Sequence, residues 1–197
     1  MGHDHETLAF YDREAPVYAA RARGGDHPHL SEFLACLAPG ARILELGCGG
    51  GQDAKVMLDA GFDVVPTDGS TGLAVEAERL IGRPVRILLF EDLAEGEAYD
   101  AVWANACLLH VPEDSLADVL ARIYRALKPG GLFRASYKSG QGGDRDGLGR
   151  YYNFPTRESL AAAYAAAGAW ATTEFGETDG GGYDGVPRTW LIATARR

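Results

Sequence analysis

The residues best suited to chemistry lie where a short apolar stretch, residues 43–46, runs into a cluster of glycines. Glycine occupies positions 47, 49, 50 and 51, and a helical pattern begins directly after them. A buried strand that ends in bare backbone and opens a helix presents unpaired N–H groups and a positive dipole end to the space above it. Because glycine has no side chain, its backbone can approach a ligand closely. The stretch predicts a nucleotide-type pocket, although a tight turn without a ligand has the same pattern.

Two acidic residues follow later apolar stretches, at points where strands should end. Asp68 comes about 20 residues after the glycine cluster, and its carboxylate can accept hydrogen bonds from both hydroxyls of a ribose. Asp92 can accept a hydrogen bond from an adenine amino group while the N–H of Leu93 donates to the ring. Two alternatives stay open: Asp68 is a turn residue that caps its own backbone, or Glu91 rather than Asp92 points inward.

Two residues are candidates for catalysis. His110 lies just past the fourth expected strand, where it could accept a proton or, alternatively, bond to the backbone. Tyr137 ends the fifth expected strand. The chain has no G-x-S-x-G motif and no cysteine paired with a base. Its three cysteines share no metal-ligand spacing, so no metal site is expected.

A parallel sheet is needed to bring these residues together. Apolar residues recur at helical spacing between the first strands, most clearly at Leu116, Val119, Leu120, Ile123 and Leu127. Strands that alternate with helices predict an α/β fold with both faces of the sheet covered. The last two strands are joined too closely for a helix, which predicts a hairpin. The expected strands cover residues 41–47, 62–67, 85–90, 99–105, 132–137, 170–175 and 188–195.

The glycine cluster reads Glu45-x-Gly47-x-Gly49-x-Gly51, and this resembles motif I of the class I S-adenosylmethionine-dependent methyltransferases. A dinucleotide fingerprint would need a glycine where Gln52 stands. From the N-terminal tyrosines to Lys-Pro-Gly-Gly at 128–131, the chain is also diffusely similar to small bacterial methyltransferases of the tellurite-resistance and thiopurine-like group. The resemblance implies a Rossmann-like three-layer sandwich, with a mostly parallel seven-stranded sheet in the order 3-2-1-4-5-7-6 and strand seven antiparallel.

The resemblance also implies a site for S-adenosylmethionine, which becomes S-adenosylhomocysteine after transfer. A backbone carbonyl near Asn105 would hold the cofactor's ammonium group, and Leu108 would pack on its adenine. An N-terminal lid would bring a tyrosine, Tyr11 or Tyr18, near the methionine portion and Arg21 near its carboxylate; the alternative is a helix packed by two aromatic residues. The cofactor-binding residues expected on these grounds are Tyr11, Tyr18, Arg21, Glu45, Gly47, Cys48, Gly49, Gly51, Asp53, Asp68, Gly69, Ser70, Asp92, Leu93, Asn105 and Leu108.

The methyl acceptor should enter over the same edge of the sheet. A glycine-rich, charged loop begins at residue 139, where strand five ends, and is too polar to belong to the core. It carries Arg145, Arg150 and Tyr151, while Tyr183 lies in the final hairpin's turn on the same side. Two such loops over one pocket suggest a gate. The arginines could attract an anionic acceptor, or they could be solvated loop charges.

Composition limits the class of protein. The 197 residues suit one domain, with 1–40 as a helical cap or lid and 41–197 as the cofactor-binding sheet and substrate loops. The formal charge of −9 argues against a nucleic-acid partner. No apolar run is long enough to span a bilayer, and the N-terminus lacks the build of a secretory signal. The odd number of cysteines favours a reducing, cytoplasmic environment. The chain is expected to be a monomer or a homodimer.

These patterns together predict methyl transfer from S-adenosylmethionine to a small-molecule acceptor by in-line displacement at carbon. Such a reaction needs alignment and exclusion of water more than a catalytic triad. One alternative is a module that binds S-adenosylmethionine without catalysis. A NAD-linked dehydrogenase is disfavoured by Gln52 and by the absence of a second domain.

Overall fold

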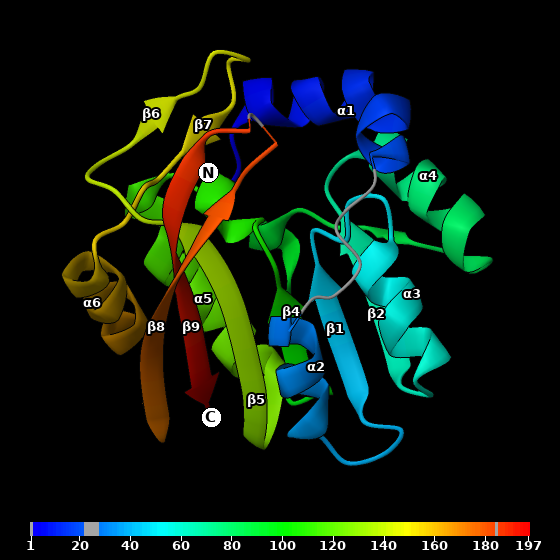
Figure 1. Cartoon of the computed structure of the whole chain (residues 1–197). Helices are drawn as coiled ribbons and strands as arrows, with labels where there is room; N and C mark the ends of the chain where they lie inside the picture. Colours follow the sequence, from blue (N-terminus) through cyan, green and yellow to red (C-terminus); the bar gives the residue numbers. More distant parts are fainter. Residues whose placement is uncertain (1, 22–27, 184) are drawn as a thin grey trace.

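The sheet of the computed structural model, which describes residues 2–21, 28–183 and 185–197, has seven strands in the order β3-β2-β1-β4-β5-β9-β8 (Figure 1). Strand β9 runs antiparallel to both of its neighbours, and the other pairs are parallel. The strands are β1 (Arg42–Leu46), β2 (Asp63–Asp68), β3 (Arg86–Ile87), β4 (Tyr99–Ala104), β5 (Leu127–Lys138), β8 (Thr172–Gly181) and β9 (Pro187–Arg196). Two short strands, β6 (Asp144–Arg145) and β7 (Tyr151–Tyr152), form a separate pair. Counting only the main sheet, the order is 3-2-1-4-5-7-6, and the predicted fold class is confirmed.

Helices cover both faces of this sheet. On one face, α2 (Pro28–Ala35) and α3 (Gln52–Asp59) bury Leu30, Phe33 and Met57 against the strands, and α4 (Thr71–Ile81) lies beside α3. On the other face lie α5 (Leu116–Ala126) and α6 (Arg157–Ala167). The expected packing of residues 30–37 on the sheet is confirmed.

The amphipathic pattern that predicted α5 matches its buried side. Leu116, Val119, Leu120 and Ile123 are all buried in the larger core cluster, as expected from their spacing. Leu127 is buried too, but it begins β5 instead of ending the helix. Apolar periodicity therefore placed the core-facing side correctly and the helix end one residue late.

Strand β3 is shorter than expected. Only Arg86 and Ile87 pair with β2, opposite Thr67 and Asp68 at its carboxyl end. Residues beyond them have no further β2 residue to pair with, and the chain turns into a 3₁₀ helix, η1 (Phe90–Asp92). The acids at 91 and 92 therefore lie on a helical turn beyond the strand.

The C-terminal strands are longer than expected. Strand β5 includes the Lys-Pro-Gly-Gly segment 128–131, where Gly130 has a φ of +78° and the register with β4 shifts. Strand β8 extends to Gly181, through glycines expected in a loop, because its backbone pairs with β9 along its whole length. The predicted hairpin is confirmed, and its turn is shorter than the sequence indicated.

Helix α1 (His5–Ala20) lies across the edge of the sheet where β1, β2 and β4 end, as Figure 1 shows at the top of the molecule. Asp4 caps this helix by accepting a hydrogen bond from the N–H of Thr7 at 2.9 Å. The described residues contain no helix long and apolar enough to cross a membrane. The boundary between a cap (1–40) and the sheet unit stays a prediction.

Candidate active site

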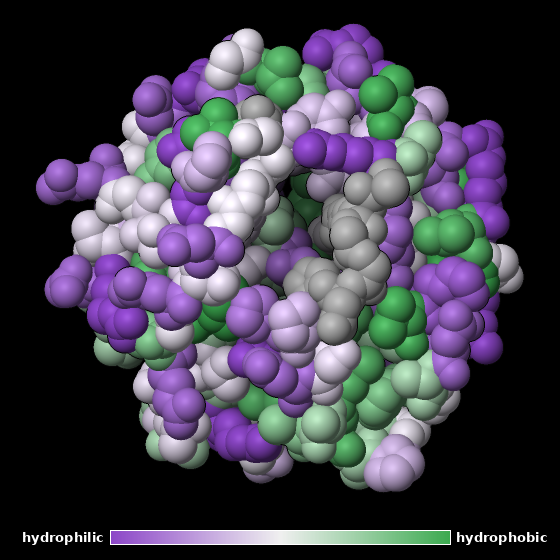
Figure 2. All heavy atoms as spheres, in the orientation of Figure 1, coloured by the Kyte–Doolittle hydropathy of each residue, from purple (hydrophilic) through white to green (hydrophobic). Residues whose placement is uncertain are grey.

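A pocket opens between α1 and the carboxyl ends of the parallel strands. Figure 2 shows the molecule hollowed in this region, with hydrophobic residues in its depth. The empty volume, including the open mouth, is about 700 Å³. The lining residues are His3, Asp4, Thr7, Leu8, Tyr11, Tyr18, Gly47, Gly49, Asp68, Gly69, Leu73, Leu88, Leu89, Phe90, Asn105, Ala106, Cys107 and His110.

Bare backbone forms the wall of this pocket after β1. Gly47 has a φ of +63°, and a Cβ added there would lie 2.4 Å from the Cβ of Cys107. A side chain at position 47 would therefore be strained by the backbone conformation and would also collide with Cys107, so the position favours glycine. Gly49 has a φ of +58°, and its N–H donates to Oδ2 of Asp68 at 2.8 Å. The strand end, the glycines and Asp68 thus meet as the sequence predicted.

Asp68 is a buried carboxylate held by backbone donors. Its Oδ1 accepts a hydrogen bond from the N–H of Ser70 at 2.8 Å, which leaves further lone pairs on both oxygens. Burial raises the pKa of Asp68 to about 6, and the bonds from Ser70 and Gly49 partly oppose that rise. Ser70 itself caps α4, accepting from the N–H of Leu73 at 3.1 Å. A ligand with hydroxyl donors would relieve the cost of this buried charge.

Asn105 is fixed at the end of β4 by polar neighbours on two sides. Its Nδ2 donates to Asp53 at 3.2 Å, and Asp53 also accepts from Nε1 of Trp103 at 2.9 Å. Its Oδ1 accepts from Oγ of Ser136 at 2.7 Å. Asn105 lines the pocket, whereas Asp53 lies behind it and acts by orienting Asn105.

The wall beyond β3 is apolar. Leu88, Leu89 and Phe90 line the pocket there. Asp92 is exposed and outside the lining, and Leu93 is buried in the core with its N–H directed to the carbonyl of Phe90 at 3.4 Å. The predicted base-binding pair of Asp92 and Leu93 is therefore wrong, because β3 ends early and η1 turns both residues away.

The N-terminal helix closes the pocket with aromatic side chains. Tyr11 and Tyr18 both line it and meet edge to face, with ring centres 5.2 Å apart. Tyr18 also stacks on Tyr183 from the last hairpin, again at 5.2 Å. Arg21 does not line the pocket: it donates to the carbonyl of Tyr183 at 2.7 Å and lies over that ring. The two tyrosines lie where a lid was predicted, and the loop predicted to gate the pocket contributes Tyr183 as a neighbour of that lid.

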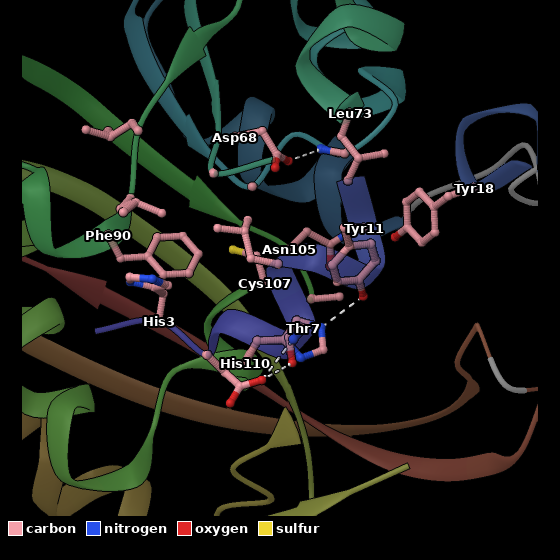
Figure 3. A pocket seen from close by; sticks show the side chains of 18 residues that line it. His3, Thr7, Tyr11, Tyr18, Asp68, Leu73, Phe90, Asn105, Cys107 and His110 are labelled. Atoms are coloured by element: carbon pink, nitrogen blue, oxygen red, sulfur yellow. Dashed lines mark hydrogen bonds between the residues drawn. The ribbon is translucent and has the colours of Figure 1, made fainter. Parts of the chain in front are cut away.

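His110 lines the pocket, where Figure 3 shows its bond to Tyr11, and both of its ring nitrogens are hydrogen-bonded. Nδ1 lies 2.6 Å from the carbonyl oxygen of Tyr151, which can only accept, so Nδ1 carries the hydrogen. Nε2 then accepts from the hydroxyl of Tyr11 at 3.0 Å. Burial lowers the pKa of His110 to about 3, so the ring is neutral at physiological pH. The expected bond from His110 to the backbone is present, and the ring also faces the pocket; its role as a proton acceptor stays a prediction.

Arg150 is one of the most deeply buried side chains, contrary to the expectation of a solvated loop charge. Its side chain is 1% exposed and donates to Asp146 at 2.6 Å and to the hydroxyl of Tyr11 at 3.0 Å. Its guanidinium carbon also lies between 5.0 and 5.7 Å from the ring centres of Phe10, Tyr11, Tyr152 and Tyr183. The expectation that this loop is too polar for the core is wrong at Arg150, because a carboxylate and four rings surround its charge.

Arg145 lies on the outside of the same hairpin. Its guanidinium binds Asp4 at 2.7 Å and Glu6 at 3.1 Å, tying the hairpin to the start of α1. The backbone of Tyr151 is tied to the same helix, because its N–H donates to Oγ1 of Thr7 at 2.8 Å. Neither Arg145 nor Tyr151 lines the pocket. In this arrangement both arginines neutralise the protein's own carboxylates.

The comparison with known proteins agrees with this architecture. The family described as "Methyltransferase domain" matches residues 44–135. A crystal structure of the 1,6-didemethyltoxoflavin-N1-methyltransferase of Burkholderia thailandensis, with bound 1,6-didemethyltoxoflavin and S-adenosylhomocysteine, superposes with a TM-score of 0.75. It is 25% identical, and the match covers 98% of this chain and 87% of that one. Residues 44–135 thus match a methyltransferase domain, and the chain has the Rossmann-like fold of the class I S-adenosylmethionine-dependent methyltransferases.

Curated members of the methyltransferase class are similar over part of their length. An uncharacterized methyltransferase from Synechocystis is 32% identical over 99 residues, covering 49% of this chain and 47% of that protein. The ubiquinone biosynthesis O-methyltransferase of Pseudomonas savastanoi pv. phaseolicola is 37% identical over 99 residues, covering 47% of this chain and 42% of that protein. The chain thus spans about half the length of the curated methyltransferases it matches.

Several residues singled out on the methyltransferase pattern lie away from the pocket. The hydroxyl of Tyr137 lies 3.3 Å from that of Tyr164 in the core, so its prediction as a catalytic residue is wrong. Along β5, every second residue points to the same face, so Tyr137 shares a face with Phe133 and Ala135, and all three lie in the core cluster with α5 and α6. Six more of the expected cofactor-binding residues are buried and do not line the pocket: Glu45, Cys48, Gly51, Asp53, Ser70 and Leu108.

Other pocket residues were not singled out from the sequence. His3, Asp4, Thr7 and Leu8 line the pocket from the N-terminal segment. No local motif marks them, because their role depends on α1 crossing the strand ends. One signal was available: Leu8 is three residues from Tyr11 and so lies on the same face of a helix, which indicates that it faces the pocket with that tyrosine.

Proposed function

We propose that this chain is an S-adenosylmethionine-dependent methyltransferase that acts on a small-molecule acceptor. The observation that carries the proposal is the meeting of the Gly47 and Gly49 backbone with the Asp68 carboxylate inside one pocket, in a chain whose residues 44–135 match a methyltransferase domain. Its donors and acceptors suit a nucleoside with an amino-acid tail. A cytoplasmic location, a monomeric or dimeric state and the lack of a nucleic-acid partner stay predictions.

The residues of the pocket divide by the part of the cofactor that they would hold. Asp68 would accept from the ribose hydroxyls, and the apolar wall of Leu88, Leu89 and Phe90 would contact the base. The end beside Asn105 and Tyr18 would take the methionine portion. S-adenosylmethionine, when bound, supplies a methyl group on a positively charged sulfur. Helix α1 roofs the pocket, and its tyrosines would exclude water from the reacting atoms.

His110 and Tyr11 form the polar group beside which we place the acceptor. An acceptor that binds as an O–H or N–H must lose a proton, and neutral Nε2 of His110 is able to take it once the Tyr11 hydroxyl yields its place. Tyr11 keeps its own proton, because burial raises its pKa well above the usual value. With Arg145 and Arg150 both paired to carboxylates, the pocket favours an uncharged acceptor over an oxyanion.

A ligand comparison tests the cofactor. Thermal unfolding is measured with S-adenosylmethionine, S-adenosylhomocysteine and NAD, each near 100 times the dissociation constant expected of a specific ligand. The two adenosyl compounds should stabilise the folded state by about 2.7 kcal/mol, enough for a clear rise in Tm. A rise with NAD alone would contradict the proposal. Binding without methyl transfer to any member of a panel of phenols, ring nitrogens and thiols would instead favour the non-catalytic module.

The role of His110 is tested with a substitution that removes its basic nitrogen. We expect His110→Asn to lower kcat roughly 100-fold on an acceptor that must lose a proton; this is the lower end of general-base effects, because the pKa of His110 is low. The dissociation constant for S-adenosylhomocysteine should stay unchanged. An acceptor that is already ionised, such as a thiolate at alkaline pH, is the matched control and should keep its rate. Equal losses on both acceptors would assign His110 a structural role.

A further inference from the structure

The apolar wall beyond β3 leaves one end of the pocket without a strand-end carboxylate. Leu88, Leu89 and Phe90 face the pocket, while the acid predicted to read the base, Asp92, is exposed on η1. If the ribose lies at Asp68, a base continues toward this wall, because β3 is the neighbour of β2 in the sheet. An adenine there presents an exocyclic amino group, a hydrogen-bond donor that needs an acceptor.

The polar side chains that line this end come from the N-terminal segment, residues 2–7. Asp4 and Thr7 are already engaged: Asp4 binds Thr7 and Arg145, and the Thr7 hydroxyl donates to Asp4 at 2.7 Å. His3 lies beside Phe90 in Figure 3, at the opposite end of the pocket from Tyr18. Its Nδ1 lies 2.7 Å from Oε1 of Glu91, the acid that directly follows Phe90 of this apolar wall.

The position of His3 is fixed on both sides along the chain. Gly2 is buried so tightly that an added Cβ would lie 2.9 Å from Oε2 of Glu91 and 3.2 Å from Cγ2 of Val119. On the other side, Asp4 caps α1 and pairs with Arg145 at 2.7 Å. The side chain of His3 is only 14% exposed. The imidazole therefore occupies a defined place over the pocket.

Glu91 also sets which nitrogen of His3 faces the ligand. Burial acts to raise the pKa of Glu91, but the hydrogen bond and charge of His3 and the backbone N–H groups of Glu91 and Gly2 together outweigh it, so the pKa is lowered and the carboxylate is ionised at neutral pH. An ionised carboxylate only accepts, which puts the hydrogen of His3 on Nδ1. In the neutral ring Nε2 is then an acceptor, and its partner among the described residues is Nδ1 of His5 at a long 3.4 Å.

We propose that His3, oriented by Glu91, reads the adenine of the cofactor by accepting a hydrogen bond from its exocyclic amino group. The N-terminal segment then serves as a base-recognition element that folds over the ligand, and Glu91 is its positioning residue. This inference rests on the proposed function, since it names a contact to the same cofactor. It goes beyond that function by assigning base specificity to a side chain outside the sheet and its loops.

The test compares two ligands that differ at one position of the base. S-adenosylhomocysteine carries the amino group, and S-inosylhomocysteine carries a carbonyl oxygen there, which cannot donate. We expect the unaltered chain to bind the adenosyl compound about tenfold more tightly, the worth of one net hydrogen bond. In His3→Leu this preference should vanish through weaker binding of the adenosyl compound. His5→Leu removes the weak partner of the same Nε2 and should keep the preference or increase it.

Two substitutions at Glu91 test the orienting role. Glu91→Gln retains an oxygen that can accept from Nδ1 and should keep most of the preference, whereas Glu91→Ala should lose it. Urea unfolding of each variant without ligand checks that the fold is intact. If His3→Leu weakens both ligands equally, or neither, the inference is overturned while the cofactor assignment stands. If the unaltered chain binds neither ligand, the proposed function itself fails, and this inference with it.

Discussion

Asp68→Asn should weaken binding of S-adenosylmethionine by two orders of magnitude or more and leave the chain folded. Hydrogen bonds to a charged acceptor contribute about 1.5–3 kcal/mol each, and the ribose would make two of them to this carboxylate. An amide retains one weaker acceptor and turns an NH₂ group toward a hydroxyl, so a loss of about 3 kcal/mol, roughly 150-fold in Kd, is expected. Calorimetric titration measures it directly.

A matched control separates the site from general charge effects. Asp63→Asn removes an exposed carboxylate at the other end of the same strand and should not change the affinity. Normal binding by Asp68→Asn would remove Asp68 from the site. A variant that fails to fold would be recognised by its urea unfolding curve, and folding is expected because the amide oxygen can still accept from Gly49 or Ser70.

Because Asp68 has a raised pKa, we expect both the stability of the chain and its affinity for the cofactor to depend on pH. The pKa of Asp68 in the free folded chain is about 6, against a usual 3.8, so the folded state holds a proton that the unfolded state has lost between these values. Stability from this group is therefore greatest below about pH 4 and falls by up to about 3 kcal/mol as pH rises through 6. Ligand affinity should change in the opposite sense, rising through pH 6 as the carboxylate ionises. Both trends should be absent in Asp68→Asn.

What the sequence predicted well has a local or periodic cause. The parallel sheet covered on both faces followed from the alternation of strands and helices, and its strand order followed from the resemblance to the methyltransferases. Asp68 followed from its place just past one of the expected strands. The role of Gly47 could be predicted because a glycine at the end of a buried strand allows the backbone to approach a ligand closely. These features depend on residues within one strand–helix unit, which is the range that sequence patterns report.

What the sequence missed depends on where segments end and on distant partners. Asp92 was misplaced because β3 pairs with only two residues of β2, a limit set by the partner strand. Tyr137 was misplaced although alternation along β5 puts it on the same face as Phe133, so here the available signal was not used. His3 reaches the pocket only because α1 crosses the sheet edge, and the bond from His3 to Glu91 spans 88 residues.

The burial of Arg150 shows how one long-range contact ties the closing segments together. Its guanidinium touches rings from α1, from β7 and from the tip of the β8–β9 hairpin, and it bonds both Asp146 and Tyr11. Through Tyr11 it is linked to His110, so the same cation supports the roof of the pocket and the candidate proton acceptor. A polar loop sequence gives no sign of this, because the compensating partners come from three separate segments.

Arg150→Met should therefore destabilise the chain strongly. Asp146, with a side chain 5% exposed, would keep a buried charge without its cation, and breaking such a pair costs about 3–5 kcal/mol. Arg145→Met is the matched control: this neighbouring arginine is 40% exposed and its pairs contribute about 0–1 kcal/mol. Urea unfolding at pH 7 measures both variants.

A double substitution isolates the cause of the loss. In Arg150→Met with Asp146→Leu, no buried charge remains, and we expect recovery of much of the stability. Burial acts to raise the pKa of Asp146, but the Arg150 guanidinium together with the N–H groups of Arg150 and Leu148 outweighs burial and holds the pKa below its usual value. The stability that the pair contributes is therefore present at neutral pH and lost in acid. Arg150→Met should accordingly lose less relative to the unaltered chain at pH 3 than at pH 7. Equal losses at both pH values, with no recovery in the double variant, would mean that Arg150 acts by filling space among the four rings, and that its charge is incidental to closing the pocket.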